Sequence, residues 1–467
     1  MPEKKKKVVA KKVTSKTVAT KPAQKTVKSV KAEDKSKKIK KIPQTVRGMK
    51  DILPQDGQLW RHLHAVADNI SNSYNFEFVE TPILEEAALF VKTIGKNTDI
   101  ISKEMYAFED RDGSKLALRP EGTASIVRSY LNNGMISLSQ PVNMWYYGPM
   151  FRHERPQAGR YRQFHQYGCE IIGNADAVAD AQLIVMGYNF FRDLGINANV
   201  YINSIGTPED RERYIVELVG YFRSKRSYLS EESKLRISKN PLRILDSKDP
   251  QDQEVVAEAP QIIDWLSEKS KTYFMKVLEY LDELDIPYVL KPTLVRGLDY
   301  YTDTVFEFFD VDSPEKSQSA LGGGGRYNLL IEELGGEATP ATGFAIGLDR
   351  VALILKKKIE TKEFTPNAGK LKLYFAHLGD PAKKRALFLI EELRRGGIAV
   401  YHNFGKPSLK AQLEQANKHD VSHAIILGQK EMQDDTIIIR DMSSGIQEMV
   451  DQKKIVREIE KLQRNSQ

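Results

Sequence analysis

Hydrophobic side chains recur at helical spacing soon after the lysine-dominated start of the chain. Leu59, Leu63, Val66, Ile70 and Tyr74 follow one another at intervals of three or four residues. Apolar residues at this period share one face of a helix, so the spacing predicts an amphipathic helix that packs on the rest of the protein.

Alternating and β-branched runs predict the strands of a large first domain. Strands are expected over residues 76–82, 115–119, 141–151, 163–170, 198–204 and 305–309. Helices are expected over residues 84–92, 124–131 and 176–194, and residues 341–355 run from a strand into a helix. Residues 207 to about 290 are charged and helical in pattern, with no strand-like run before residues 288–290. We interpret them as an insertion packed on the main sheet.

The pattern changes after a hydrophilic linker at residues 360–369. Strands are predicted over residues 370–377, 399–403, 423–427 and 436–441, and helices over residues 381–395, 408–418 and 453–462. Strands that alternate with helices in this order predict a small α/β domain with a mixed sheet.

The most informative stretch is residues 147–170, two extended arms around a charged loop (residues 152–162). Its arginines are Arg152, Arg155, Arg160 and Arg162. Arginine presents rigid, paired donors that match phosphate oxygens, so the loop is a candidate phosphate-binding device. The alternative is a solvated hairpin tip. Glu154, Gln166 and Glu170 favour the first interpretation, because they add groups that bind a cationic or hydrogen-bonding ligand.

Further candidate ligand contacts lie where strands become helices. Glu121 and Thr123 follow a predicted strand, although Thr123 also fits the role of a helix N-cap. Arg350 falls near the start of a helix, where an anion would be favoured, and the alternative there is a surface pair with Asp349. The four glycines 322–325 let a backbone approach a ligand or another strand, which alone is a weak signal.

Charge is distributed unevenly along the 467 residues. The net charge is +7, but residues 1–41, the Lys-rich tail, hold sixteen lysines and three acidic residues. The tail therefore carries +13 and the remaining 426 residues −6. The tail has no aromatic residue, so we expect disorder and non-specific binding to nucleic acid. A merely solubilising tail is the alternative.

Cysteine content and hydropathy exclude several classes of protein. A single cysteine, Cys169, excludes an internal disulfide framework and a cysteine-rich zinc site. No apolar run approaches the ~18 residues of a membrane span. We expect a cytoplasmic protein.

Several motifs together resemble one family. Phe151-Arg-His-Glu-Arg-Pro with Gln163-Phe-His-Gln-Tyr-Gly-Cys-Glu170 resembles motif 2 of class II aminoacyl-tRNA synthetases in its histidyl form. Residues 294–301 and 322–327 are similar to the two histidine-specific signatures of the histidyl-tRNA synthetases. Residues 343–350 resemble motif 3, and residues 78–85 resemble motif 1. One departure is Asn328, where the family usually has Asp.

The resemblance covers about residues 42–465 and implies the fold and the partners. It implies an α+β catalytic domain (residues 42–368) on a six- or seven-stranded antiparallel sheet flanked by helices, with the helical insertion at about 207–290. Residues 369–467 would form a mixed-sheet α/β anticodon-binding domain. The implied function is ligation of L-histidine to tRNA(His), with ATP and Mg²⁺, by a homodimer formed through motif 1.

The resemblance also implies a role for each candidate residue. Arg152 and Arg296 would be catalytic at the α-phosphate, and ATP would contact Arg152, Glu154, Arg160 and Arg350. Histidine would be bound by Glu121, Gly122, Thr123, Gln166, Glu170, Tyr300 and Tyr301. Arg155 and Gln157 would contact the tRNA acceptor end. No side chain is assigned to a metal, since Mg²⁺ would be held mainly by the ATP phosphates.

Two other functions remain possible at this point. One is a non-catalytic paralogue, such as the synthetase-like regulatory subunit of histidine biosynthesis, which lacks the anticodon-binding domain. The other is a nucleic-acid-binding protein that uses the Lys-rich tail, with the enzyme fold as a scaffold.

Overall fold

The computed structural model describes residues 42–95, 98–312, 320–366, 371–406 and 408–465. Its centre is a long hairpin in which β5 (Val142–Phe151) pairs with β6 (Gln163–Ile172) over ten residues. The two strands are the predicted arms around the charged loop. The Lys-rich tail lies outside the described residues, so its disorder stays a prediction.

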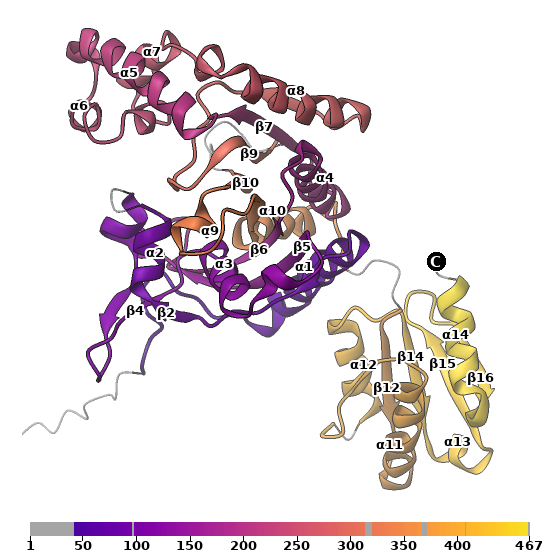
Figure 1. Ribbon diagram of the computed structural model, residues 1–467. Coiled ribbons are helices and arrows are strands. Elements are labelled where there is room, and N and C mark those ends of the chain that lie inside the picture. Colours follow the sequence, from indigo (N-terminus) through magenta and orange to yellow (C-terminus); the bar gives the residue numbers. More distant parts are fainter. Residues whose placement is uncertain (1–41, 96–97, 313–319, 367–370, 407, 466–467) are drawn as a thin grey trace, which may run out of the picture. The chain divides into compact units, whose positions relative to one another are not determined.

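Eight strands form the larger sheet, in the order β1-β5-β6-β11-β10-β9-β7-β8 (Figure 1). Neighbours from β5 to β7 are antiparallel, whereas the short edge strands β1 and β8 are parallel to theirs. The other bounds are β1 Glu77–Phe78, β7 Ala198–Ser204, β8 Tyr288–Leu290, β9 Thr302–Asp310, β10 Gly322–Arg326 and β11 Ala341–Gly347. The expected sheet type is confirmed, but the count of six or seven strands was too low, because the parallel edge strands are only two and three residues long.

Three helices cover one face of this sheet: α1 (Pro54–Ser73), α4 (Ala177–Asp193) and α10 (Leu348–Glu360). The predicted face of α1 is buried there, including Leu59 and Leu63. Tyr167 and Cys169 of β6 point into the same core. Because side chains alternate across a strand, Gln166 and Glu170 face the opposite side.

The opposite side of the sheet carries α3 (Thr123–Asn132) and a small sheet of β2 (Leu84–Glu86), β4 (Lys115–Leu118) and β3 (Ala107–Glu109). The prediction of a helix over residues 84–92 was partly wrong, since its first residues form β2 and only α2 (Ala87–Thr93) is helical. Pairing with β4 explains the difference, because a strand partner overrides the local helix propensity of leucine and glutamate.

The insertion is helical, as predicted. Its helices are α5 Pro208–Ser224, α6 Glu231–Arg236, α7 Pro250–Ala257 and α8 Glu268–Glu283. Side chains of Thr207, Ser230, Asp249 and Ser267 cap them by accepting hydrogen bonds from backbone N–H groups. α8 packs on α4, so the insertion is attached to the helical layer of the main sheet.

A separate five-stranded mixed sheet, ordered β13-β12-β14-β15-β16, forms the C-terminal part. Its elements are β12 Leu373–His377, α11 Asp380–Arg395, β13 Val400–His402, α12 Leu409–Lys418, β14 His423–Leu427, α13 Gln429–Gln433, β15 Thr436–Asp441, β16 Gln447–Asp451 and α14 Ile455–Asn465. Every predicted element is present. β16 and α13 were not predicted, because Gln447–Asp451 becomes a strand only by pairing with β15.

Candidate active site

A cavity of about 230 Å³ opens between the central strands and the start of α3. Segments far apart in the sequence line it: the turn before α3, the hairpin β5–β6, the loop before β9, the strand β10 and the start of α10. The predicted site residues on its wall are Glu121, Thr123, Arg152, Glu154, Arg160, Gln166, Arg296, Tyr300, Tyr301 and Arg350.

Glu121 ties the cavity to the beginning of α3. Its carboxylate oxygens accept hydrogen bonds from the backbone N–H groups of Thr123 (2.7 Å) and Ala124 (2.9 Å). Glu121 therefore caps the helix with its side chain. The alternative interpretation of Thr123 as the N-cap was wrong, because Gly122 occupies the N-cap position and Thr123 is the first residue of α3. Burial raises the pKa of Glu121 above its ordinary value.

Glu170 lies behind Thr123 and is absent from the cavity wall. Its side chain is fully buried, and it accepts hydrogen bonds from the hydroxyls of Thr123 (2.7 Å) and Tyr327. Burial raises the pKa of Glu170 to about 8, although both hydroxyls oppose this shift. Tyr327 was not among the predicted site residues, although it ends the segment 322–327 that is similar to a histidine-specific signature.

Gly122 serves packing rather than contact with the cavity. A Cβ on Gly122 would lie 2.4 Å from the ring of Tyr146, and one on Gly168 would lie 2.3 Å from it. The two glycines thus let the ring pass between α3 and β6, where its buried hydroxyl lies near Glu121 and Glu170.

Arg296 is held in the cavity wall by a carboxylate that the sequence analysis missed. Its guanidinium pairs with Glu307 of β9 and lies 5.6 Å above the ring of Tyr301. Burial alone would lower the pKa of Arg296, but Glu307 and the neighbouring tyrosines together raise it. Among the described residues, Nε of Arg296 and the amide oxygen of Gln166 are buried and have no hydrogen-bond partner. Both atoms are therefore available to a ligand in the cavity.

Cationic side chains gather at the other end of the cavity. Arg152 donates from Nε to the carbonyl of Pro120 at 2.8 Å, and Arg350 donates to the carbonyls of Gly159 and Ala320. Burial and the charge of nearby Arg160 lower the pKa of Arg350 to about 10. A bound polyanion relieves the electrostatic repulsion between positive groups that lie so close together.

Two predicted site residues lie outside the cavity wall, and one predicted ion pair is not formed. Arg155 and Gln157 are exposed near the tip of the charged loop, outside the cavity wall. Asp349 is buried, and it pairs with Lys50 at 3.0 Å instead of forming a surface pair with Arg350.

Arg119 was also missed by the sequence analysis. It is almost fully buried and donates to the carbonyl oxygens of Thr81 and Pro149. It thereby joins the segment before β2 to the strand β5, next to Arg152.

An antiparallel sheet with helices on both sides, a hairpin that presents arginines, and a strand-to-helix junction with a further arginine together define a class II aminoacyl-tRNA synthetase. The comparisons with known proteins are specific within that class. A histidyl-tRNA synthetase family model matches residues 48–206 and 236–351, and an anticodon binding domain model matches residues 372–462. The chain belongs to the histidyl-tRNA synthetase family.

Individual relatives agree with this assignment. The chain is 43% identical over 419 residues to a histidine–tRNA ligase of Dehalococcoides mccartyi, covering 90% of this chain and 99% of the relative. It is 41% identical over 426 residues to that of Natranaerobius thermophilus, with the same coverage. The crystal structure of the apo histidyl-tRNA synthetase of Staphylococcus aureus aligns with a TM-score of 0.72 at 33% identity, covering 89% of this chain and 99% of that one.

Proposed function

We propose that this chain is a histidine–tRNA ligase that works in two steps. In the first, a carboxylate oxygen of L-histidine attacks the α-phosphorus of ATP, and the bond to pyrophosphate breaks. In the second, a ribose hydroxyl at the 3′ end of tRNA(His) attacks the carbonyl carbon of the adenylate, and AMP leaves. The first step needs no general base, because a carboxylate is already ionised at neutral pH.

The observation that carries this proposal is the division of one cavity into two chemical halves. Glu121, Thr123 and Gln166 offer acceptors suited to an ammonium group, whereas Arg152, Arg160 and Arg350 offer donors suited to a triphosphate. Such a cavity binds an amino acid beside a nucleotide. The enzyme then contributes alignment and neutralisation of the charge that develops on phosphorus.

The remaining roles are proposed from the family resemblance. Arg296 would lie at the α-phosphate, next to the substrate carboxylate, and Arg152 would hold the α-phosphate from the other side. Glu154 would contact the adenine end. Tyr300, Tyr301 and Glu170 would recognise the imidazole, with Glu170 acting from behind Thr123. A site that pairs both ring nitrogens rejects apolar analogues, since its own polar groups would otherwise stay unpaired.

We assign Mg²⁺ to the phosphates of ATP. Among the described residues, no cluster of three or more His, Cys, Asp or Glu side chains could hold a metal ion. The arginines that we assign to the phosphates, Arg152, Arg160 and Arg350, would bind the same oxygens directly. When bound with ATP, Mg²⁺ would supply further neutralisation of the phosphate charge.

Contacts with tRNA are proposed at three places. Residues 369–467 would bind the anticodon, the exposed Arg155 and Gln157 would meet the acceptor end, and the Lys-rich tail would add non-specific attraction to phosphates. Residues 42–368 would form the catalytic domain, with the insertion at about 207–290.

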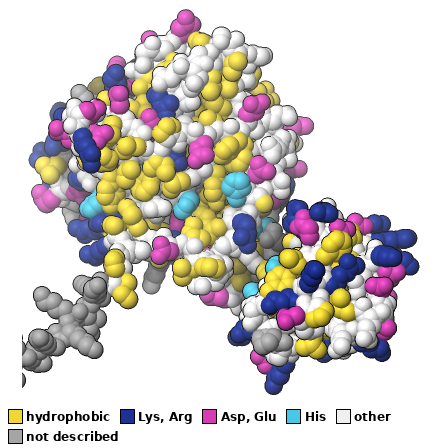
Figure 2. Space-filling view, turned by 90° about the horizontal axis from the view of Figure 1, so that it is seen from below, with side chains coloured by type: hydrophobic (Ala, Val, Ile, Leu, Met, Phe, Trp, Pro, Cys, Tyr) yellow, Lys and Arg dark blue, Asp and Glu magenta, His cyan; other side chains and the backbone are white. Residues whose placement is uncertain are grey.

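A homodimer through motif 1 is also proposed. Phe78, Ile83 and Leu84 of that segment are 52%, 42% and 41% exposed, and apolar side chains gather on one face of the molecule (Figure 2). Large exposed apolar surface is typical of an interface. We further propose a cytoplasmic location, and no helix within the described ranges is long and apolar enough to cross a bilayer.

A non-catalytic paralogue is the second candidate. One solved structure of similar fold, from Bacillus halodurans, is titled as an ATP phosphoribosyltransferase regulatory subunit/histidyl-tRNA synthetase, at 22% identity and a TM-score of 0.57. The match of residues 372–462 to an anticodon binding domain favours the ligase, because the regulatory paralogue is expected to lack that domain.

Histidine-dependent exchange of pyrophosphate into ATP tests the proposal. We expect exchange by the full chain that requires histidine and falls by a factor on the order of a thousand in Arg296→Ala, as for the loss of a group that stabilises transition-state charge. Exchange that is absent from the folded wild-type protein, or that persists in the variant, would contradict the proposal.

A further inference from the structure

A short turn before α1 contacts the charged loop behind the cavity wall, where Tyr161 and Asp349 line the cavity. The turn comprises residues 46–50, and it is closed by a hydrogen bond from Met49 N–H to the carbonyl of Val46 at 2.9 Å. The carbonyl of Gly48 accepts a hydrogen bond from Arg162 N–H at 2.7 Å, and the carbonyl of Arg162 accepts one from Arg152 N–H at 2.9 Å. The turn therefore adds a backbone partner to the hairpin at the point where Arg152 leaves β5.

The contact at Gly48 is too close for a side chain. A Cβ there would lie 2.8 Å from Cγ of Pro156 and 2.9 Å from Cγ of Arg162, and the φ angle of Gly48 is +86°. Only glycine combines this conformation with such an approach. The turn is thus fitted to the charged loop.

Lys50 extends the contact to a second segment. Its Nζ lies 3.0 Å from Oδ1 of Asp349 and 3.9 Å from the centre of the Tyr161 ring. The side chain of Asp349 is 4% exposed and also accepts a hydrogen bond from His165 N–H at 2.7 Å. Lys50 is therefore held between a buried carboxylate and an aromatic face, which makes its position better defined than that of an ordinary surface lysine.

The two partners of Lys50 are the sequence neighbours of two cavity arginines. Tyr161 follows Arg160, and Asp349 precedes Arg350. Both arginines line the cationic end of the cavity. We propose that Lys50 and Gly48 are positioning residues for ATP: they hold the charged loop and the first turn of α10 together, so that Arg160 and Arg350 meet the triphosphate. This inference rests on the proposed function.

Among the described residues, no hydrogen bond or ion pair joins the turn directly to Thr123 or Glu170 at the opposite end of the cavity. Thr123 and Glu170 are held by Glu121 and Tyr327, which belong to the turn before α3 and to the segment after β10. A change at Lys50 should therefore affect ATP and leave histidine binding intact. A loss of general stability would not separate the two substrates in this way.

The test measures histidine-dependent pyrophosphate exchange at varied ATP and at varied histidine. Lys50→Met keeps the aliphatic stem and removes the charge, Lys50→Arg restores the charge, and Gly48→Ala probes the close contact. Lys356→Met is the matched control, because Lys356 lies on α10, pairs with Asp56 at 2.7 Å and is 37% exposed, compared with 35% for Lys50.

We expect Lys50→Met to raise the KM for ATP on the order of tenfold, with the KM for histidine within about twofold of wild type. Lys50→Arg should recover most of the loss, Gly48→Ala should reproduce it, and Lys356→Met should match wild type. Deletion of residues 2–41 should leave both KM values unchanged, which separates the turn from the tail.

Three outcomes would overturn the inference while wild-type exchange stands. They are an unchanged KM for ATP in Lys50→Met, an equal rise in both KM values, or the same effect in Lys356→Met. If the folded wild-type protein shows no exchange, the proposed function itself fails, and the inference fails with it.

Discussion

The hydroxyl of Thr123 donates a hydrogen bond of 2.7 Å to Glu170, which joins the first residue of α3 to the central strand β6. Thr123 lies between the cavity and the buried carboxylate of Glu170. The same carboxylate also accepts a hydrogen bond from Tyr327. Thr123 thus has two tasks, since it lines the cavity and orients the group that we assign to imidazole recognition.

Thr123→Val should weaken use of histidine more than use of ATP. The substitution keeps the shape of the side chain but leaves a buried oxygen of Glu170 without one of its donors, which costs roughly 1–3 kcal/mol. We expect kcat/KM for histidine to fall on the order of tenfold or more in pyrophosphate exchange. Thr123→Ser, which retains the hydroxyl, is the control, and equal activity of the two variants would contradict the assignment.

Gly343→Ala should remove Glu170 from its position. A Cβ at Gly343 would lie 1.5 Å from Oε2 of Glu170, a distance that no small adjustment relieves. We expect histidine-dependent exchange to be lost almost completely. Gly57→Ala on α1 is the matched control, because no atom would lie within 4 Å of a Cβ there. Full activity of Gly343→Ala would show that the position of Glu170 is unimportant.

Stability of the protein without ligand should fall as pH rises above about 4.5. The folded-state pKa of Glu170 is about 8, raised by burial from its ordinary value of 4.5. Glu170 contributes its full stabilisation below the lower pKa, and this contribution is lost as pH rises toward 8, because the unfolded chain releases the proton first. The slope from one group is at most about 1.4 kcal/mol per pH unit.

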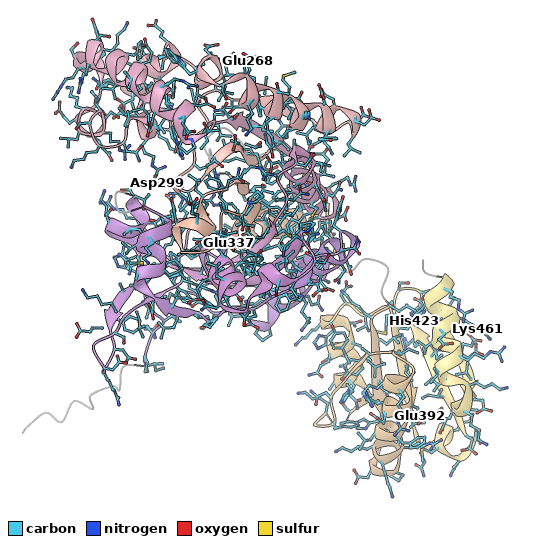
Figure 3. All side chains as sticks on the ribbon, viewed as in Figure 1. Glu268, Asp299, Glu337, Glu392, His423 and Lys461 are labelled. Carbon is cyan, nitrogen blue, oxygen red and sulfur yellow. The ribbon has the colours of Figure 1, made fainter. Side chains whose placement is uncertain are left out.

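Denaturant unfolding at several pH values measures this slope. Glu170→Gln, which stays neutral, should flatten it between pH 4.5 and 8. Glu268→Gln is the control, since the side chain of Glu268 is 91% exposed at the start of α8 (Figure 3). Equal slopes in wild type and Glu170→Gln would mean that Glu170 is ionised throughout this range.

The buried pair of Arg326 and Asp180 should dominate the attachment of α4 to β10. Their side chains are 1% and 0% exposed and lie 2.7 Å apart. Asp180 also accepts a hydrogen bond from the hydroxyl of Tyr273 of α8. Arg326→Met leaves a buried carboxylate without its charge partner, so we expect a loss of about 3–5 kcal/mol in the free energy of unfolding. Tyr273→Phe should cost only about 1 kcal/mol. A loss below about 1 kcal/mol in Arg326→Met would contradict this view of the pair.

Deletion of residues 2–41 should weaken binding of tRNA without changing adenylate formation. The deleted segment holds sixteen lysines and only three acidic residues, whereas the rest of the chain has a negative net charge. The logarithm of the binding constant falls linearly with the logarithm of the salt concentration. Each lysine that no longer neutralises a phosphate should make this slope less steep by roughly 0.9. Affinity for tRNA should be measured at several salt concentrations. Identical slopes with and without the segment would show that it does not bind RNA in the complex.

The sequence by itself determined the elements and the chemical inventory of the site. Alternation along Gln163–Ile172 separated the core face, with Tyr167 and Cys169, from the face that carries Gln166 and Glu170. The strand-to-helix change before Arg350 was equally local, because dihedral preference and periodicity act over a few residues. The order of the motifs along the chain also carried the family resemblance.

Only the tertiary structure decided which groups meet. It placed Glu170 behind Thr123, gave Glu121 the role of helix cap, paired Arg296 with Glu307 and brought Lys50 to Asp349. Lys50 and Asp349 are about 300 residues apart, and no local preference relates them. The pairing follows from the packing of α1 and α10 against the same face of the sheet, which brings the starts of these two helices together.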